Sequence, residues 1–160
     1  MMRLDSPAFH DGAPIPRQHT VDGADLSPPL GWSEAPSGTR SLILVMEDAD
    51  APSPVGPGKP FLHWFVYNLP PSAEGLELGV NRTGLPTPAR SGRNDFGSVG
   101  YIGPAPVSGE HRYVFRLLAL DTTLQTTALG DGGRTRPYEA VARHVLATAE
   151  LNGTYRRSAQ

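Results

Sequence analysis

The sequence predicts a mainly β, antiparallel domain with one helix near its C-terminus. Two observations carry this prediction: short apolar runs separated by turn-rich segments, and one stripe of apolar residues at helical spacing. The 160 residues include 18 glycines and 17 prolines, about double their ordinary share, which favours many turns. No segment is long enough to be a linker, so we expect one domain covering residues 1–160.

Three strands are expected in chain order. Residues 1–40 are turn-rich and offer only short extended candidates, such as residues 30–32. Residues 41–48 and 61–69 are mainly apolar and contain β-branched or aromatic residues. Prolines follow both, so each is expected to be a strand buried on both faces. Residues 70–110 are again rich in loops. A third strand is predicted over residues 111–121, with His111, Tyr113, Phe115 and Leu117 on one face because side chains alternate.

One segment near the C-terminus has the spacing of a helix. Pro137 and Glu139 suit a helix N-terminus, and Asn152-Gly153 is a plausible end. The apolar stripe recurs at intervals of three and four residues, at Tyr138, Val141, Ala142, Val145 and Ala149. We therefore expect an amphipathic helix from about residue 137 to residue 152.

Composition excludes several classes of function. The formal net charge is −2, which argues against sequence-independent nucleic-acid binding. The chain has no cysteine, which excludes disulfides, thiolate zinc sites and cysteine nucleophiles. The N-terminus shows no secretory signal, and the longest apolar run, residues 42–46, is far too short for stable insertion in a membrane. The expected location is the cytoplasm.

Carboxylates and histidines gather at predicted strand ends. Asp48 and Asp50 follow Glu47 where the first long strand ends, and these negative charges repel one another unless donors face them. His63 sits in an apolar strand, and His111 opens the third strand after a loop containing Gly103 and Pro104. Taken singly, each histidine is more often a hydrogen-bonded core residue, and the aspartates are more often a turn. Together they would form a polar pocket if the strand ends meet.

Two other chemistries fit these residues less well. Asp48, Asp50, His63 and His111 are oxygen and nitrogen ligands suited to a metal, but their spacing matches no compact metal motif. A serine hydrolase is less favoured still, because no G-x-S-x-G elbow is present. We therefore expect no metal, no cofactor and no enzymatic activity.

Two ordered blocks of the sequence resemble the phosphatidylethanolamine-binding protein (PEBP) family, and most closely its bacterial Raf-kinase-inhibitor-like branch. The first block is D-A-D-A-P at residues 48–52, followed by His63-Trp64. The second is G-P-A-P-V-S-G-E-H-R-Y-V-F at residues 103–115. The resemblance extends over roughly residues 20–157. One departure is Val107, where many members have a second consecutive proline.

The resemblance implies a β-sandwich-like fold with a few short helices and one C-terminal helix. It also implies a small pocket for phosphate- or carboxylate-bearing ligands, such as phosphoethanolamine headgroups or phosphorylated partners. The ligand-binding residues carried over onto this sequence are Asp48, Asp50, Pro52, His63, Gly103, Pro104, His111 and Tyr113. Relatives further imply a cis Ala51-Pro52 bond and a homodimer, although the residues themselves leave the oligomeric state open.

The leading hypothesis is a non-enzymatic binding protein for a small anion or a phosphorylated ligand. The alternative is a protein inhibitor of a protease or a kinase that acts through the rim of the same pocket. A carboxylate beside an imidazole favours the charged ring, which then donates to an anion. On that basis, anion binding is expected to weaken as pH rises through the histidine range.

Overall fold

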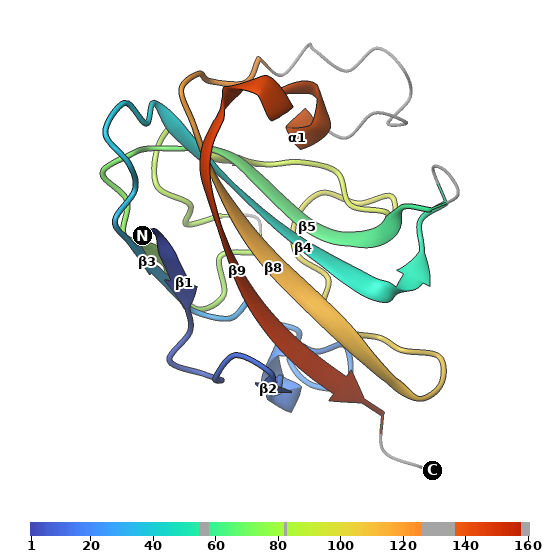
Figure 1. The fold of residues 1–160 in the computed structure, drawn as a ribbon. Coiled ribbons are helices and arrows are strands. Elements are labelled where there is room, and N and C mark those ends of the chain that lie inside the picture. The colour runs from blue at the N-terminus through green and yellow to red at the C-terminus, as the bar shows by residue number, and fades with distance from the viewer. Residues whose placement is uncertain (55–57, 82, 126–136, 158–160) are drawn as a thin grey trace.

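The computed structural model describes residues 1–54, 58–81, 83–125 and 137–157. Six strands form the larger sheet, in the order β2-β9-β8-β4-β5-β7, and three form a smaller sheet, in the order β1-β3-β6. Figure 1 shows β9, β8, β4 and β5 side by side, with β1 and β3 beside them as a separate layer. The predicted fold class, a mainly β, sandwich-like domain with few helices, is confirmed. The strands are β1 (Arg3–Asp5), β2 (Ala13–Pro14), β3 (Leu30–Ser33), β4 (Ser41–Pro52), β5 (Pro60–Leu69), β6 (Gly75–Leu76), β7 (Arg90–Ser91), β8 (Glu110–Leu120) and β9 (Val145–Arg156).

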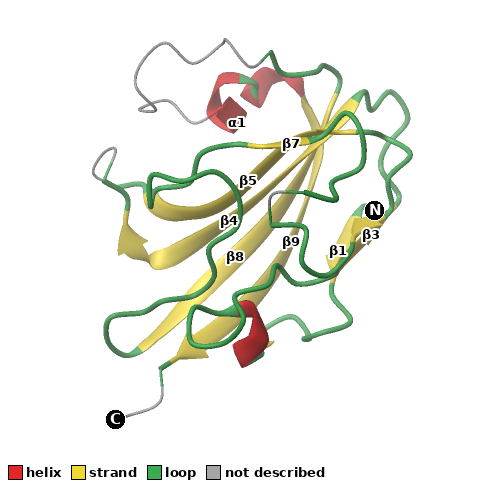
Figure 2. Cartoon of the chain, turned by 180° about the vertical axis from the view of Figure 1, so that it is seen from behind, coloured by secondary structure: helices red, strands yellow, loops and turns green. Residues whose placement is uncertain are grey.

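The centre of the large sheet is an antiparallel ladder of long strands. β4 pairs with β5 on one side and with β8 on the other, and β8 also pairs with β9. Every residue from Ser41 to Asp48 is buried, which confirms that this strand is covered on both faces. In Figure 2, loops lie across the face of the sheet that Figure 1 hides.

Two apolar clusters cover the two faces of this sheet. The larger lies between the sheets and includes the predicted face of β8, with Tyr113, Phe115 and Leu117. The smaller lies on the opposite face, where Ile43, Val45, Phe65, Leu118 and Leu120 pack against Tyr138 and Val141. Because side chains alternate along β4, Glu47 and Asp48 point to opposite faces.

The C-terminal segment differs from its prediction. Helical structure is confined to α1 (Pro137–Ala140) and a 3-10 turn, η2 (Ala142–His144), and the following residues form β9. The expected helix is therefore wrong from residue 145 onward. Another short 3-10 turn, η1 (Arg17–His19), lies in the N-terminal region. No helix in the described ranges is long and apolar enough to cross a membrane.

The sheet explains why β9 replaces a longer helix. β8 needs a partner along its whole length, and residues 145–156 supply it. Leu146, Thr148 and Glu150 are exposed, whereas Ala149 and Leu151 are buried, which is the two-residue period of a strand. Gly153 does not end a helix. A Cβ there would lie 2.5 Å from Ile15 Cγ1, so glycine lets the N-terminal segment pack closely against β9.

The predicted cis bond between Ala51 and Pro52 is also wrong. Among the described residues, the only cis peptide bond joins Thr87 to Pro88. Ala51 and Pro52 continue β4, and Pro52 pairs with Pro60 after a register shift that follows Asp48. The bond between them is trans, and the pairing of β4 with β5 is irregular between Asp48 and Pro52.

Candidate ligand-binding site

The predicted polar residues meet where β4 ends and β8 begins. Asp48 on β4 lies opposite Phe61 of β5 on one side and Tyr113 of β8 on the other. His63 is two residues along β5 from Phe61, and His111 is two residues along β8 from Tyr113. Because β5 and β8 both pair with β4, the sheet places the two histidines, 48 positions apart in the sequence, on either side of Asp48.

Asp48 and His111 form the central pair of this site. Nδ1 of His111 lies 2.6 Å from Oδ2 of Asp48, and the side chains are 18% and 4% exposed. The other carboxylate oxygen, Oδ1, accepts the backbone N–H of Asp50 at 2.8 Å. Both oxygens of Asp48 therefore face donors of the protein, and this removes the cost that a buried, unpaired charge would carry.

His63 has a different environment from His111. Its Nδ1 lies 2.7 Å from the carbonyl oxygen of Ile102, a contact that requires a proton on Nδ1. The residue is only 3% exposed. Burial lowers the pKa of His63, although the Ile102 carbonyl and the Asp48 charge act against this shift. At His63, desolvation therefore outweighs the attraction of the nearby carboxylate.

Tyr113 connects the two histidines. The centroid of its ring lies 5.4 Å from that of His63, in an edge-on arrangement, and 6.4 Å from that of His111, in a stacked one. Its hydroxyl is fully buried and makes no hydrogen bond of good geometry. Burial raises the pKa of this hydroxyl, and the negative charge of Asp48 adds to the rise. Tyr113 thus lies beneath the pair as a neutral, rigid support.

An aromatic group borders the site on the β5 side. Phe61 and Phe96 lie 4.7 Å apart between ring centroids, and each contacts the His63 ring edge-on. Phe96 is 44% exposed. It presents an apolar surface to solvent next to a polar site.

The loop that carries Gly103 and Pro104 is anchored by an N-terminal loop. Gly103 N donates to Oδ1 of Asp25 at 2.8 Å, and Val21 N donates to the carbonyl of Pro104 at 3.3 Å. A Cβ on Gly103 would lie 2.1 Å from the carbonyl oxygen of His19, so only glycine fits this contact. Partial burial raises the pKa of Asp25. The loop that carries Gly103 and Pro104 therefore forms a wall beside the site, and these two residues contribute to it through their backbone.

Two contacts with Asp22 connect the end of β9 to the same N-terminal loop. Tyr155, which pairs with His111, donates its hydroxyl to Oδ2 of Asp22 at 2.7 Å. Arg157 Nε lies 3.1 Å from Oδ1 of Asp22. These contacts lower the pKa of Asp22, with the Tyr155 hydrogen bond as the main cause. They also bring the Arg157 charge close enough to act on Tyr113.

Asp50 and Pro52 lie away from the centre of the cluster. Asp50 is exposed, and its Oδ2 accepts the backbone N–H of Arg112 at 2.8 Å. Pro52 is exposed at the end of β4. Of the eight predicted residues, the structure brings Asp48, His63, His111 and Tyr113 together, places Gly103 and Pro104 in an adjoining wall, and gives Asp50 and Pro52 a supporting position.

Sequence reasoning missed Asp22, Asp25, Phe96 and Arg157. The contacts that bring them to the site join segments far apart in the chain, so their roles there do not follow from the local sequence. Within the described part of the chain, no three His, Asp or Glu side chains gather in a way that could hold a metal ion.

Comparisons with known proteins identify the family of this chain. The family profile described as phosphatidylethanolamine-binding protein matches residues 5–156. A UPF0098 protein of Methanothermobacter thermautotrophicus is 45% identical over 157 residues, covering 98% of this chain and 99% of its own.

Solved structures give the same result. The PEBP homolog CT736 from Chlamydia trachomatis is 38% identical, with a TM-score of 0.84 and 98% coverage of both chains. YbcL of E. coli, described as a new member of the mammalian PEBP family, is 31% identical, with a TM-score of 0.86 over 98% of this chain and 99% of its own. The chain therefore belongs to the phosphatidylethanolamine-binding protein family.

Proposed function

We propose that this family member is a binding protein whose site at Asp48, His63, His111 and Tyr113 takes phosphate- or carboxylate-bearing ligands. The Asp48–His111 pair is the observation that carries the proposal. Both Asp48 oxygens are occupied by protein donors, which offset the negative charge of the carboxylate beside an incoming anion. The partly exposed His111 ring keeps Nε2 for the ligand, and charge-assisted hydrogen bonds of this kind are the strong ones.

The surroundings support a ligand with a small anionic group. Arg157 acts on Tyr113 while it is paired with Asp22, and the exposed Phe96 offers an apolar surface for the remainder of a ligand. His63 is buried and held by Ile102, so it supports the site rather than supplying its charge. We propose binding without turnover, and the cytoplasm as the place where it occurs.

Isothermal titration with O-phosphorylethanolamine, and separately with sodium sulfate, tests this function. The wild type should bind at least one of these probes, and His111→Gln should weaken binding about tenfold or more, the usual effect of losing a hydrogen bond to a charged group. His144→Gln is the matched control, because His144 is also paired with a carboxylate, Asp121, but on an exposed surface. Wild-type protein that binds neither probe, or a His111→Gln variant that binds like the wild type, would contradict the proposal.

A second function, inhibition of a partner protease or kinase through the pocket rim, is supported by exposed apolar side chains. Val107 is 94% exposed in the loop before His111, and Phe96 is 44% exposed beside His63. Apolar side chains at these positions would give a partner protein apolar area to cover when it contacts the rim. Assays of purified proteases and kinases should then show inhibition by the wild type that the double variant Phe96→Ser, Val107→Ser loses. Inhibition that survives this variant would exclude the rim.

A further inference from the structure

The geometry of the Asp48–His111 pair points to a covalent role beyond reversible binding. We propose that Nε2 of His111 accepts a phosphoryl group from a small phosphoramidate or acyl phosphate. The inference uses the same pair of side chains as the proposed function but does not require reversible anion binding. The inference concerns the transfer of one phosphoryl group to His111, where the group then stays.

The pair orients the ring for this reaction. When the ring is neutral, the contact of Nδ1 with Asp48 Oδ2 at 2.6 Å places its one proton on Nδ1 and leaves the lone pair on Nε2, whereas the ring with a second proton on Nε2 is the form that binds an anion. Asp48 cannot turn away, because its other oxygen accepts the N–H of Asp50. The stacked Tyr113 ring supports the imidazole from one side. The nucleophilic nitrogen is therefore the ring nitrogen that does not contact Asp48, on a side chain that is 18% exposed.

The carboxylate also stabilises the product of the transfer. With phosphoramidate in its zwitterionic form, whose nitrogen already carries three protons, the Nε2 lone pair attacks phosphorus, the P–N bond breaks, and its electron pair leaves with nitrogen as ammonia. With an acyl phosphate, the P–O bond to the acyl group breaks and its electron pair leaves with the carboxylate. The Nδ1 proton stays in the hydrogen bond, so the ring becomes positively charged while it carries the phosphoryl group. Asp48 is 4% exposed, and its charge is little screened by water, so it favours this positive ring more than an exposed carboxylate can.

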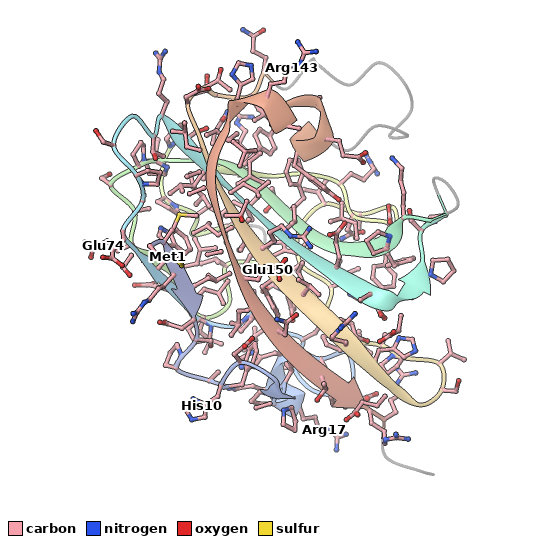
Figure 3. The ribbon with its side chains drawn as sticks, viewed as in Figure 1. Met1, His10, Arg17, Glu74, Arg143 and Glu150 are labelled. Atoms are coloured by element: carbon pink, nitrogen blue, oxygen red, sulfur yellow. The ribbon has the colours of Figure 1, made fainter. Side chains whose placement is uncertain are left out.

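The other histidines provide an internal comparison. His19 and His63 are buried, at 0% and 3% exposure. His10 is exposed and projects from the surface in Figure 3. His144 lies 2.8 Å from Asp121, in a pair whose side chains are 49% and 46% exposed. If access alone governed reactivity, His10 and His144 would react before His111. If a buried carboxylate governs it, His111 reacts first.

The test is to incubate the folded protein with potassium phosphoramidate, follow the mass of intact protein, and map the modified residue over time. We expect one phosphoryl group on His111 about tenfold faster than on His144, which corresponds to about 1.4 kcal/mol of barrier lowering. Phosphorus NMR should place the group on Nε2. Labelling that follows exposure, with His10 and His144 ahead of His111, would overturn the proposal, as would a group on Nδ1.

Two matched variants separate the carboxylate effect from access. Asp48→Asn should slow labelling of His111 about tenfold, whereas Asp121→Asn should leave His111 unchanged. Circular dichroism confirms that each variant is folded. If Asp48→Asn does not fold, the order of labelling in the wild type still decides the question. A folded Asp48→Asn protein that labels His111 at the wild-type rate would refute the role of the carboxylate.

Discussion

His63 and His111 both stand in strands next to Asp48, yet the protein uses them differently. His111 pairs directly with the carboxylate, while His63 donates to the Ile102 carbonyl and is buried deeply enough that its pKa falls. Their positions followed from two sequence blocks. Their roles depend on how deeply each ring is covered, which is set by loops far along the chain.

The buried His63 predicts how stability depends on pH. Its folded-state pKa lies below that of the unfolded chain, so the unfolded state binds more protons once pH falls below about 6.5. Stability is therefore lost as pH falls from about 6.5 toward the folded value, and the buried His19, whose pKa is also lowered, adds to the loss. Urea unfolding at pH 7.5 and 5.5 should show a lower midpoint at the acidic pH.

The variant His63→Gln isolates this contribution, because glutamine can still donate to Ile102. The loss of unfolding free energy between pH 7.5 and pH 5.5 should be smaller in His63→Gln than in the wild type, by up to about 1.4 kcal/mol. His10→Gln, at an exposed position, controls for removal of a histidine. A His63→Gln protein with the wild-type dependence on pH would show that another group titrates.

At the scale of elements, the buried strands were predictable and the last strand was not. Continuous apolar runs marked β4 and β5, and alternation marked the inner face of β8. Residues 137–152 satisfy a helical stripe as well as a strand alternation. The strand forms from residue 145 onward because β8 needs a pairing partner there. The local sequence of the segment does not reveal this requirement. Tyr138 and Val141 still pack as the stripe required, but from a short helical turn and its flank.

The short α1 segment is held to the sheet by a buried carboxylate. The Tyr138 hydroxyl donates to Glu47, which is 3% exposed and also accepts from Arg116. Tyr138→Phe should lower the free energy of unfolding by about 1–3 kcal/mol, because a buried charged acceptor loses a donor. Tyr67→Phe is the control, since the Tyr67 hydroxyl makes no hydrogen bond to the described residues. Equal unfolding free energies for both variants, measured in urea, would mean that Arg116 alone satisfies Glu47.

At the scale of the whole molecule, the site exists only when distant segments meet. β4, β5 and β8 supply its side chains, the loop containing Gly103 supplies a wall, and the N-terminal loop anchors that wall through Asp25. The family motifs contain the first two parts of this assembly. They do not contain Asp25 or Arg157. Asp25 acts by accepting from Gly103, which is 78 positions away, and Arg157 by pairing with Asp22, which is 135 positions away.

This construction predicts that a ligand of the site stabilises the entire fold. The unfolded chain holds His63 and His111 in unrelated surroundings, so it offers no site, and a ligand that binds only the native state adds RT ln(1 + [L]/Kd) to the unfolding free energy. O-phosphorylethanolamine at about one hundred times its Kd should add about 2.7 kcal/mol and raise Tm by about 5–10 °C for a chain of this length. Differential scanning calorimetry of the wild type and of His111→Gln at equal ionic strength would measure this rise in Tm.

General salt effects change the Tm of both proteins alike, so the informative quantity is the difference between the two shifts in Tm. A shift of the same size in the variant would mean that the ligand stabilises the protein without occupying the site at His111.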